Sequence, residues 1–143
     1  MSHVFIWDSM RNEMSNNLFL KTIGGSLVGL GFTLSNFIMI SNNKECYLLD
    51  LPFGNAILGE LYYLNRKGIS LLEQFYDTPN KYIRKKIFCY YNSCGCDKDK
   101  YEKIDCLIYC INKPDLIESH IKKGIIIESG DWYNFSKIEM LKN

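Results

Sequence analysis

Residues 4–11 read VFIWDSMR, four apolar residues followed at once by a polar pair. A short apolar run that ends at a turn signal predicts a buried strand, here residues 4–7. Asp8 and Ser9 then predict a tight turn, because short polar side chains hydrogen-bond to nearby backbone groups in turns. The chain is therefore expected to open with a buried strand that leads directly into a turn.

Strand-like segments make up most of the remaining chain. Each is a short run rich in apolar, β-branched or aromatic residues, with turn-forming residues at its boundaries. Besides the first strand, we expect strands at residues 25–34, 37–41, 46–49, 57–64, 81–91 and 104–111. The last two are joined by a charged segment and are expected to pair as a hairpin.

Helical spacing is limited to a few short segments. Ile69, Leu72 and Tyr76 lie on one helical face, and the DTP sequence that follows stops the helix, because Pro cannot continue it. A Pro near the first turn and a Gly after the last one mark a later helix. Helices are thus expected at residues 18–20, 69–76 and 114–123.

The order of these elements predicts an α+β fold. It fits a small mixed, β-barrel-like sheet with two or three short helices better than a repeating βαβ unit. The 143 residues are the usual size of one domain, and no linker or repeat divides them. We therefore expect a single domain over residues 1–143.

Composition excludes some classes of partner. The net charge of +1 provides no electrostatic footprint for nucleic acid or anionic lipid. Residues 22–43 carry no charge, but glycines and asparagines interrupt them, which argues against a membrane-spanning helix. The start of the chain does not resemble a secretory signal. A cytoplasmic protein with no nucleic-acid or membrane partner is expected.

Six cysteines raise the question of a metal site. They are Cys46, Cys89, Cys94, Cys96, Cys106 and Cys110. The paired C-x2-C spacing of structural zinc sites is missing, and nothing else in the sequence points to an oxidising compartment. We therefore expect free thiols and no bound metal, with Cys94 and Cys96 at the tip of a hairpin loop.

Four sequence motifs occur in order along nearly the whole chain. They are WDSM after the first strand, GELY at residues 59–62, LEQFYDTP at residues 72–79 with Tyr82 and Arg84 behind it, and SGDW at residues 129–132. Together they resemble motifs of the γ-glutamylcyclotransferase superfamily, including its AIG2-like members. The resemblance implies the fold of that family.

The resemblance also implies an activity. Members of this family cyclise a γ-glutamyl group, in which the α-amine of the substrate attacks its own γ-carbonyl. The products are 5-oxoproline and a released amine, amino acid or dipeptide, a chemistry connected with glutathione metabolism. The nucleophile is already part of the substrate, so the enzyme orients it and moves protons, and no metal or nucleotide cofactor is needed. The expected partner is a small γ-glutamyl amine or peptide, and a protein partner is unknown.

The resemblance assigns substrate binding to the first loop, at Trp7, Asp8, Ser9 and Met10. Backbone N–H groups of this loop would hold the α-carboxylate of the substrate. The sequence departs from the family here, since Asp8 replaces Gly and Trp7 replaces Tyr. The added negative charge of Asp8 is expected to repel the substrate carboxylate.

A second departure concerns the catalytic base. Tyr76 stands where the family has the Glu that takes a proton from the substrate ammonium, and a phenol is a poor base at neutral pH. Asp77 and Glu73 are the candidate replacements, one adjacent and one a helical turn earlier. Their ordinary roles would be a turn former and a solvated helix residue. The main alternative is a catalytically degenerate member that binds a small molecule or a protein through the same pocket.

Overall fold

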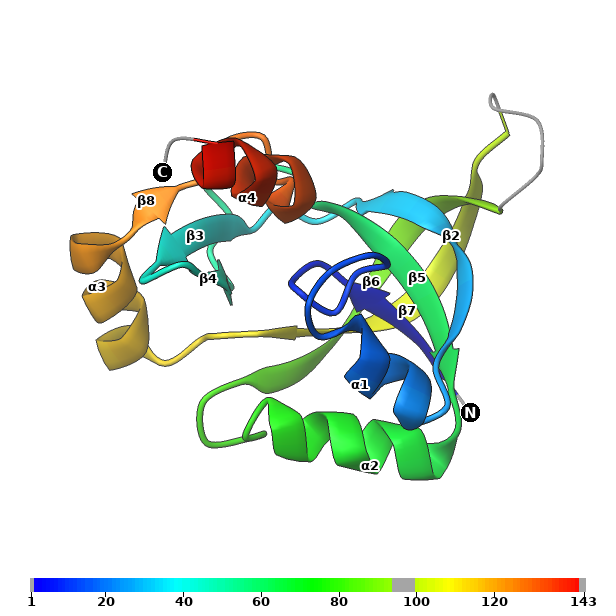
Figure 1. Ribbon diagram of the computed structural model, residues 1–143. Coiled ribbons are helices and arrows are strands. Elements are labelled where there is room, and N and C mark those ends of the chain that lie inside the picture. Colours follow the sequence, from blue (N-terminus) through cyan, green and yellow to red (C-terminus); the bar gives the residue numbers. More distant parts are fainter. Residues whose placement is uncertain (1, 94–99, 142–143) are drawn as a thin grey trace.

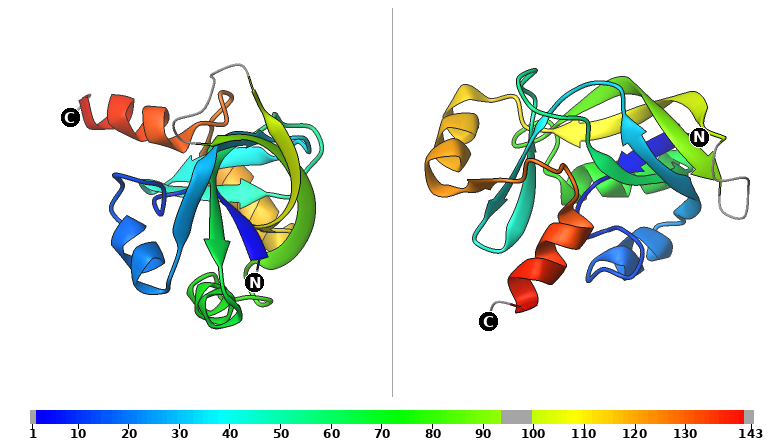
Figure 2. Two further views of the ribbon diagram at one scale, coloured as in Figure 1. Left: turned by 90° about the vertical axis from the view of Figure 1, so that its right-hand side faces the viewer. Right: turned by 90° about the horizontal axis from the view of Figure 1, so that it is seen from above.

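The computed structural model describes residues 2–93 and 100–141. Within them, five strands close into a barrel in the order β1-β5-β2-β6-β7. These strands are β1 (Ser2–Ile6), β5 (Leu58–Leu64), β2 (Ser26–Thr33), β6 (Ile83–Ser93) and β7 (Glu102–Cys110). The left view of Figure 2 looks into the barrel, whose strands form a ring. The predicted first strand is thus confirmed as part of the closed sheet, but it ends at Ile6, and the buried Trp7 lies just beyond it.

The barrel closes between the first and the last of these strands. Along one edge β1 pairs antiparallel with β5, as in Phe5 with Leu61. Along the other edge β1 pairs parallel with β7, at the single position Val4 with Leu107. The β6–β7 hairpin predicted from sequence is confirmed, with antiparallel pairing along both strands. The barrel therefore has one short closing edge and several long antiparallel ones.

A smaller sheet lies beside the barrel, in the order β4-β3-β8. Its strands are β3 (Ile38–Asn42), β4 (Glu45–Leu49) and β8 (Ile125–Ile126). The helices are α1 (Asn17–Thr22), α2 (Arg66–Phe75), α3 (Pro114–Lys123) and α4 (Trp132–Leu141). In Figure 1, α1 and α2 lie below the barrel, α3 lies at the outer end of the smaller sheet, and α4 lies on the opposite side from α2.

Local chemistry explains where α2 begins and ends. The side chain of Asn65 accepts a hydrogen bond from the backbone N–H of Gly68 at 2.8 Å, which satisfies a free donor at the helix start. The chain leaves the helix at Asp77, whose φ of 51° is the left-handed conformation that ends many helices. The predicted helix is confirmed, and the end of α2 is fixed next to the first loop.

Two elements were not predicted. α4 is missing from the sequence-based expectation because its apolar residues are not gathered on one face, so no helical period is visible. β8 has only two residues, both exposed, and exists through its pairing with β3. The part of the chain that the structure describes therefore has four helices instead of two or three. None of these helices is long and apolar enough to cross a bilayer.

The core of the barrel includes large aromatic side chains. Phe5, Trp7, Tyr62 and Tyr109 are at most 2% exposed. Gly59 allows β5 to approach β1 closely, because a Cβ there would lie 2.4 Å from the carbonyl oxygen of Ile6 and 2.8 Å from the ring of Phe5. The position therefore requires glycine, and the close approach holds the start of the first loop in place.

Candidate functional site

A cavity of about 990 Å³ opens at the end of β1. The loop after β1, the β3–β4 hairpin, the turn after α2 and α4 line most of it. The volume is in the range of small-molecule sites. The first loop and the end of α2, to which the resemblance assigns substrate binding and the base, thus meet at one cavity.

Asp8 lies in the wall of this cavity and is only 7% exposed. Its Oδ1 accepts a hydrogen bond from the backbone N–H of Met10 at 3.1 Å. Its Oδ2 accepts one from the hydroxyl of Tyr76 at 2.9 Å. Burial raises the pKa of Asp8, and the bonds to Met10 and Tyr76 oppose that rise. The loop thus presents a buried carboxylate where the resemblance leads us to expect a glycine.

Tyr76 faces Asp8 from the end of α2. The ring is 4% exposed and stacks on Trp7 and Tyr109, with ring centroids 6.2 and 5.1 Å apart. Burial, and then the charge of Asp8, raise the pKa of Tyr76 well above its usual value. The phenol therefore stays neutral and donates its proton in a hydrogen bond to the carboxylate. Its ring is packed against these aromatic neighbours.

The four residues assigned to substrate binding have different positions. Asp8 and Ser9 line the cavity. Trp7 and Met10 are fully buried behind it, and the indole N–H of Trp7 donates to the carbonyl oxygen of Tyr109 at 3.1 Å. Trp7 and Met10 therefore contribute to the site through the backbone and through packing.

Asp77 and Glu73 occupy different surroundings. Asp77 lines the cavity from an exposed turn, where its Oδ1 accepts a hydrogen bond from Asn80 at 3.1 Å. The carboxylate of Glu73 instead accepts a hydrogen bond from the hydroxyl of Tyr109 at 2.8 Å and forms an ion pair with Arg84 at 3.3 Å. Of the two, only Asp77 is among the residues that line the cavity.

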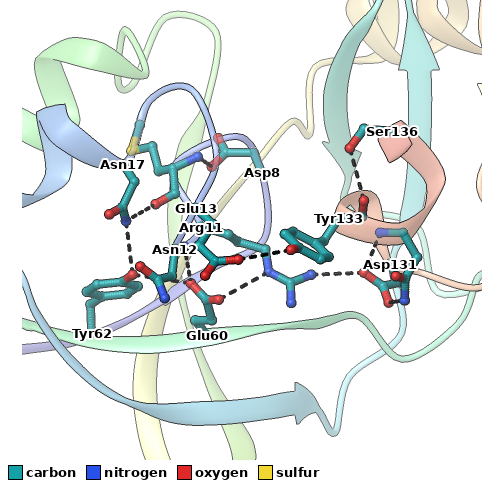
Figure 3. Close-up of polar contacts among 12 residues, drawn as sticks. Asp8, Arg11, Asn12, Glu13, Asn17, Glu60, Tyr62, Asp131, Tyr133 and Ser136 are labelled. Carbon is teal, nitrogen blue, oxygen red and sulfur yellow. Dashed lines mark hydrogen bonds and ion pairs between the residues drawn. The ribbon is translucent and has the colours of Figure 1, made fainter. Parts of the chain in front are cut away.

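A buried charge cluster of Arg11, Glu60 and Asp131 supports the first loop (Figure 3). Each of the three residues is at most 8% exposed. Arg11 Nη1 lies 3.0 Å from Asp131 Oδ1, and Arg11 Nε lies 3.7 Å from Glu60 Oε2. The cluster therefore joins residues inside or beside three of the sequence motifs, which are far apart along the chain.

Further hydrogen bonds connect the charge cluster to the loop. Glu60 Oε1 accepts from the backbone N–H of Asn12 at 2.7 Å and from the hydroxyl of Tyr62 at 3.2 Å. Asn17 donates to the same hydroxyl at 3.1 Å and to the carbonyl oxygen of Met10 at 2.8 Å (Figure 3). These contacts fix the loop on both sides of Arg11, so the orientation of Asp8 is set by a buried polar network.

Asp131 connects the charge cluster to α4. It is followed directly by the helix, and its Oδ2 accepts a hydrogen bond from the side chain of Asn134 at 2.6 Å. Its carbonyl oxygen accepts the backbone N–H of Phe135, so the residue caps the first turn. α4, which forms one wall of the cavity, is therefore attached to the first loop through Arg11.

The sequence did not reveal this network, although each of its charged residues stands inside or beside a quoted motif. Motif spacing along the chain carries no information on which charges meet in the fold. One signal was available, because Arg11, Glu60 and Asp131 each stand next to an apolar residue in the sequence. Such neighbours indicate that the charges are buried, and buried charges are usually paired.

The cavity has a charged outer part. Exposed side chains of both signs line it, namely Glu13, Lys44, Glu45, Lys81 and Lys137. Among the described residues, no group of three or more His, Cys, Asp or Glu side chains is arranged to hold a metal ion. Cys94 and Cys96 lie outside the described residues, and the absence of metal there stays a prediction.

The chain belongs to the γ-glutamyl cyclotransferase, AIG2-like family, whose sequence model matches residues 4–134. It is 24% identical to the mouse (Mus musculus) γ-glutamylaminecyclotransferase over 115 residues, which are 76% of this chain and 77% of the relative.

Solved structures share the fold. The crystal structure of an AIG2-like protein from Mus musculus has a TM-score of 0.69 at 20% identity and covers 82% of both chains. The crystal structure of an uncharacterized protein from Pyrococcus horikoshii has a TM-score of 0.67 at 12% identity, over 100% of this chain and 98% of the other. The barrel with its attached helices is therefore an AIG2-like fold.

Proposed function

We propose that the chain binds a small γ-glutamyl amine or peptide in the cavity and cyclises its γ-glutamyl group. The products are 5-oxoproline and the free amine, amino acid or dipeptide. The observation that carries the proposal is a buried carboxylate in a cavity of suitable size, in a chain of the γ-glutamyl cyclotransferase family. The mouse relative, named for action on γ-glutamylamines, supports an amine as the leaving group.

The chemistry places modest demands on the protein. The attacking amine and the γ-carbonyl belong to one molecule, so holding the substrate folded brings them together. Tyr76 and Tyr82 form a largely buried aromatic wall beside Asp8, which limits access of water. Water is the competing nucleophile, and its exclusion favours cyclisation over hydrolysis.

The outer part of the cavity suits a charged substrate. A γ-glutamyl compound carries an ammonium and a carboxylate, and the cavity offers partners for both. Lys44 and Lys81 are exposed cations, while Glu13 and Glu45 are exposed anions. Exposed charges of this kind help to orient a ligand more than they add affinity.

A second candidate function is binding without catalysis. It is favoured by one contact, the hydrogen bond from the Met10 N–H to the Asp8 carboxylate. This contact occupies a backbone donor of the loop that the resemblance assigns to the substrate carboxylate. The chain would then bind a small molecule or a protein partner in the cavity and leave it unchanged.

One experiment distinguishes the two functions. Purified protein is incubated with a panel of γ-glutamyl amines, amino acids and dipeptides, and 5-oxoproline is measured by mass spectrometry. Binding of the same compounds is measured by calorimetry. Release of 5-oxoproline above the uncatalysed rate supports cyclisation. Binding without release supports the second candidate, and neither binding nor release contradicts both.

A further inference from the structure

We infer that Asp8 is the proton acceptor of the cavity and that Tyr76 positions it. The inference rests on the proposed function, because it names the group that takes the proton during cyclisation. It moves the base from the end of α2, where the sequence led us to look, to the first loop.

The first argument is the position of the carboxylates. The cavity is lined by the acidic residues Asp8, Glu13, Glu45, Asp77 and Glu139. Glu13, Glu45 and Asp77 are exposed, and Glu139 is half-buried. Asp8 is the buried one among these described residues, next to the aromatic wall. A proton transfer that must exclude water is best served by this carboxylate.

The second argument is the way in which Asp8 is held. Each of its oxygens accepts one defined hydrogen bond, from the Met10 N–H and from the Tyr76 hydroxyl. A carboxylate oxygen can accept two, so each retains capacity for a further partner. Because Asp8 also lines the cavity, a substrate ammonium can supply that partner. The carboxylate is therefore oriented before the substrate binds, as catalytic groups need to be.

The third argument is that Asp8 is the group that can change its protonation state, because its neighbours keep theirs. Tyr76 from the end of α2, Tyr82 from the segment before β6, and Cys46 from β4 all face it, and burial raises the pKa of each well above its usual value. Arg11, on the same loop, is paired with Glu60 and Asp131. Burial also raises the pKa of Asp8 itself, which makes it a better proton acceptor.

The proton balance of the reaction closes with this single group. The ammonium gives one proton to the Asp8 carboxylate, and the amine nitrogen attacks the γ-carbonyl carbon. As the amide C–N bond breaks, the leaving nitrogen takes the proton held by Asp8 and one more from the attacking nitrogen. The ring nitrogen keeps one hydrogen, the amine leaves as an ammonium, and Asp8 is again a carboxylate.

The test compares Asp8→Asn with a matched control, Asp105→Asn, which changes an exposed carboxylate on β7. With a γ-glutamyl amine that the wild type turns over, Asp8→Asn is expected to lower kcat by roughly 10² to 10⁴-fold. KM should rise as well, because the neutral amide loses the charge-assisted hydrogen bond to the substrate ammonium, while the amide oxygen can still accept the Met10 N–H and keep the loop in place. Asp105→Asn should retain full activity. Circular dichroism and thermal unfolding confirm that both variants fold.

A second variant tests the positioning role. Tyr76→Phe removes a hydrogen bond that stabilises the charged form of Asp8, so the acid limb of the kcat profile should move to higher pH. Tyr101→Phe, at an exposed position, is the control and should leave the profile unchanged. This readout does not depend on whether Asp8→Asn folds.

The outcomes separate the inference from the proposed function. If Asp8→Asn keeps wild-type kcat while Asp77→Asn loses it, the inference is wrong and the proposed function stands. An acid limb that does not move in Tyr76→Phe also overturns the inference. If the wild type turns over no compound of the panel, the proposed function and the inference fall together.

Discussion

Replacement of Arg11 by Met tests how strongly the charge cluster holds the fold. The substitution keeps an unbranched side chain of moderate length but removes the charge that pairs with Glu60 and Asp131. Both carboxylates then stay buried without a cation, which is among the most costly changes in a protein interior.

The magnitude follows from the remaining contacts. Removing one partner of a buried ion pair costs about 3–5 kcal/mol. Glu60 retains its bonds from Asn12 and Tyr62, and Asp131 retains its bond from Asn134, so the lower end applies. A loss of about 3 kcal/mol corresponds to a fall in Tm of about 6–12 °C for a chain of this size.

The assay is urea denaturation at 25 °C combined with calorimetry. A double-mutant cycle with Asp131→Asn isolates the pair, because the neutral amide no longer needs a cation. We expect Arg11→Met to cost less in the Asp131→Asn background, with a coupling of about 1–3 kcal/mol. Additive free energies within about 0.5 kcal/mol, or a fall in Tm below about 2 °C, would refute the reasoning.

Three further predictions concern stability and metal content. Asp8→Asn should raise Tm at pH 8 and give a smaller gain at pH 4. A carboxyl whose pKa is raised in the folded state destabilises the protein as pH rises and the group ionises, so its removal helps most at high pH. Tm measured at both pH values checks this, and a larger gain at pH 4 contradicts it. Gly59→Ala should cost about 1–3 kcal/mol in urea denaturation, because its Cβ would overlap the backbone of Ile6; an unchanged midpoint would show that β1 can shift. Elemental analysis of protein prepared without chelators should find no stoichiometric zinc, and one zinc per chain would contradict the interpretation of Cys94 and Cys96 as free thiols.

Much of the fold could be predicted because its signals are local. Alternating apolar runs located the barrel strands, and helical spacing with the DTP stop located α2. The four motifs supplied the family. α4 could not be found this way, since its apolar residues show no helical period and the contact of its cap with Arg11 spans 120 residues of sequence.

The site was predicted in outline only. The sequence assigned the substrate to the first loop and the base to the end of α2, and the bond between Asp8 and Tyr76 joins these segments. It treated Asp8 as an obstacle to the substrate, because a charge at that position was judged without its hydrogen-bond partners. The two departures from the family motifs are adjacent in space, and only the fold shows that one contacts the other.

The pairing of β1 has a consequence for synthesis on the ribosome. Val4 meets its β7 partner, Leu107, only after about a hundred further residues have been made, and Phe5 meets Leu61 at about half that distance. At about 5–20 residues per second, the edge of β1 that faces β7 stays unpaired for roughly 5–20 s, although β5 can pair with the other edge earlier. During that interval the unpaired edge is open to association with other chains. A nascent chain halted before β7 cannot bury this edge in a closed barrel.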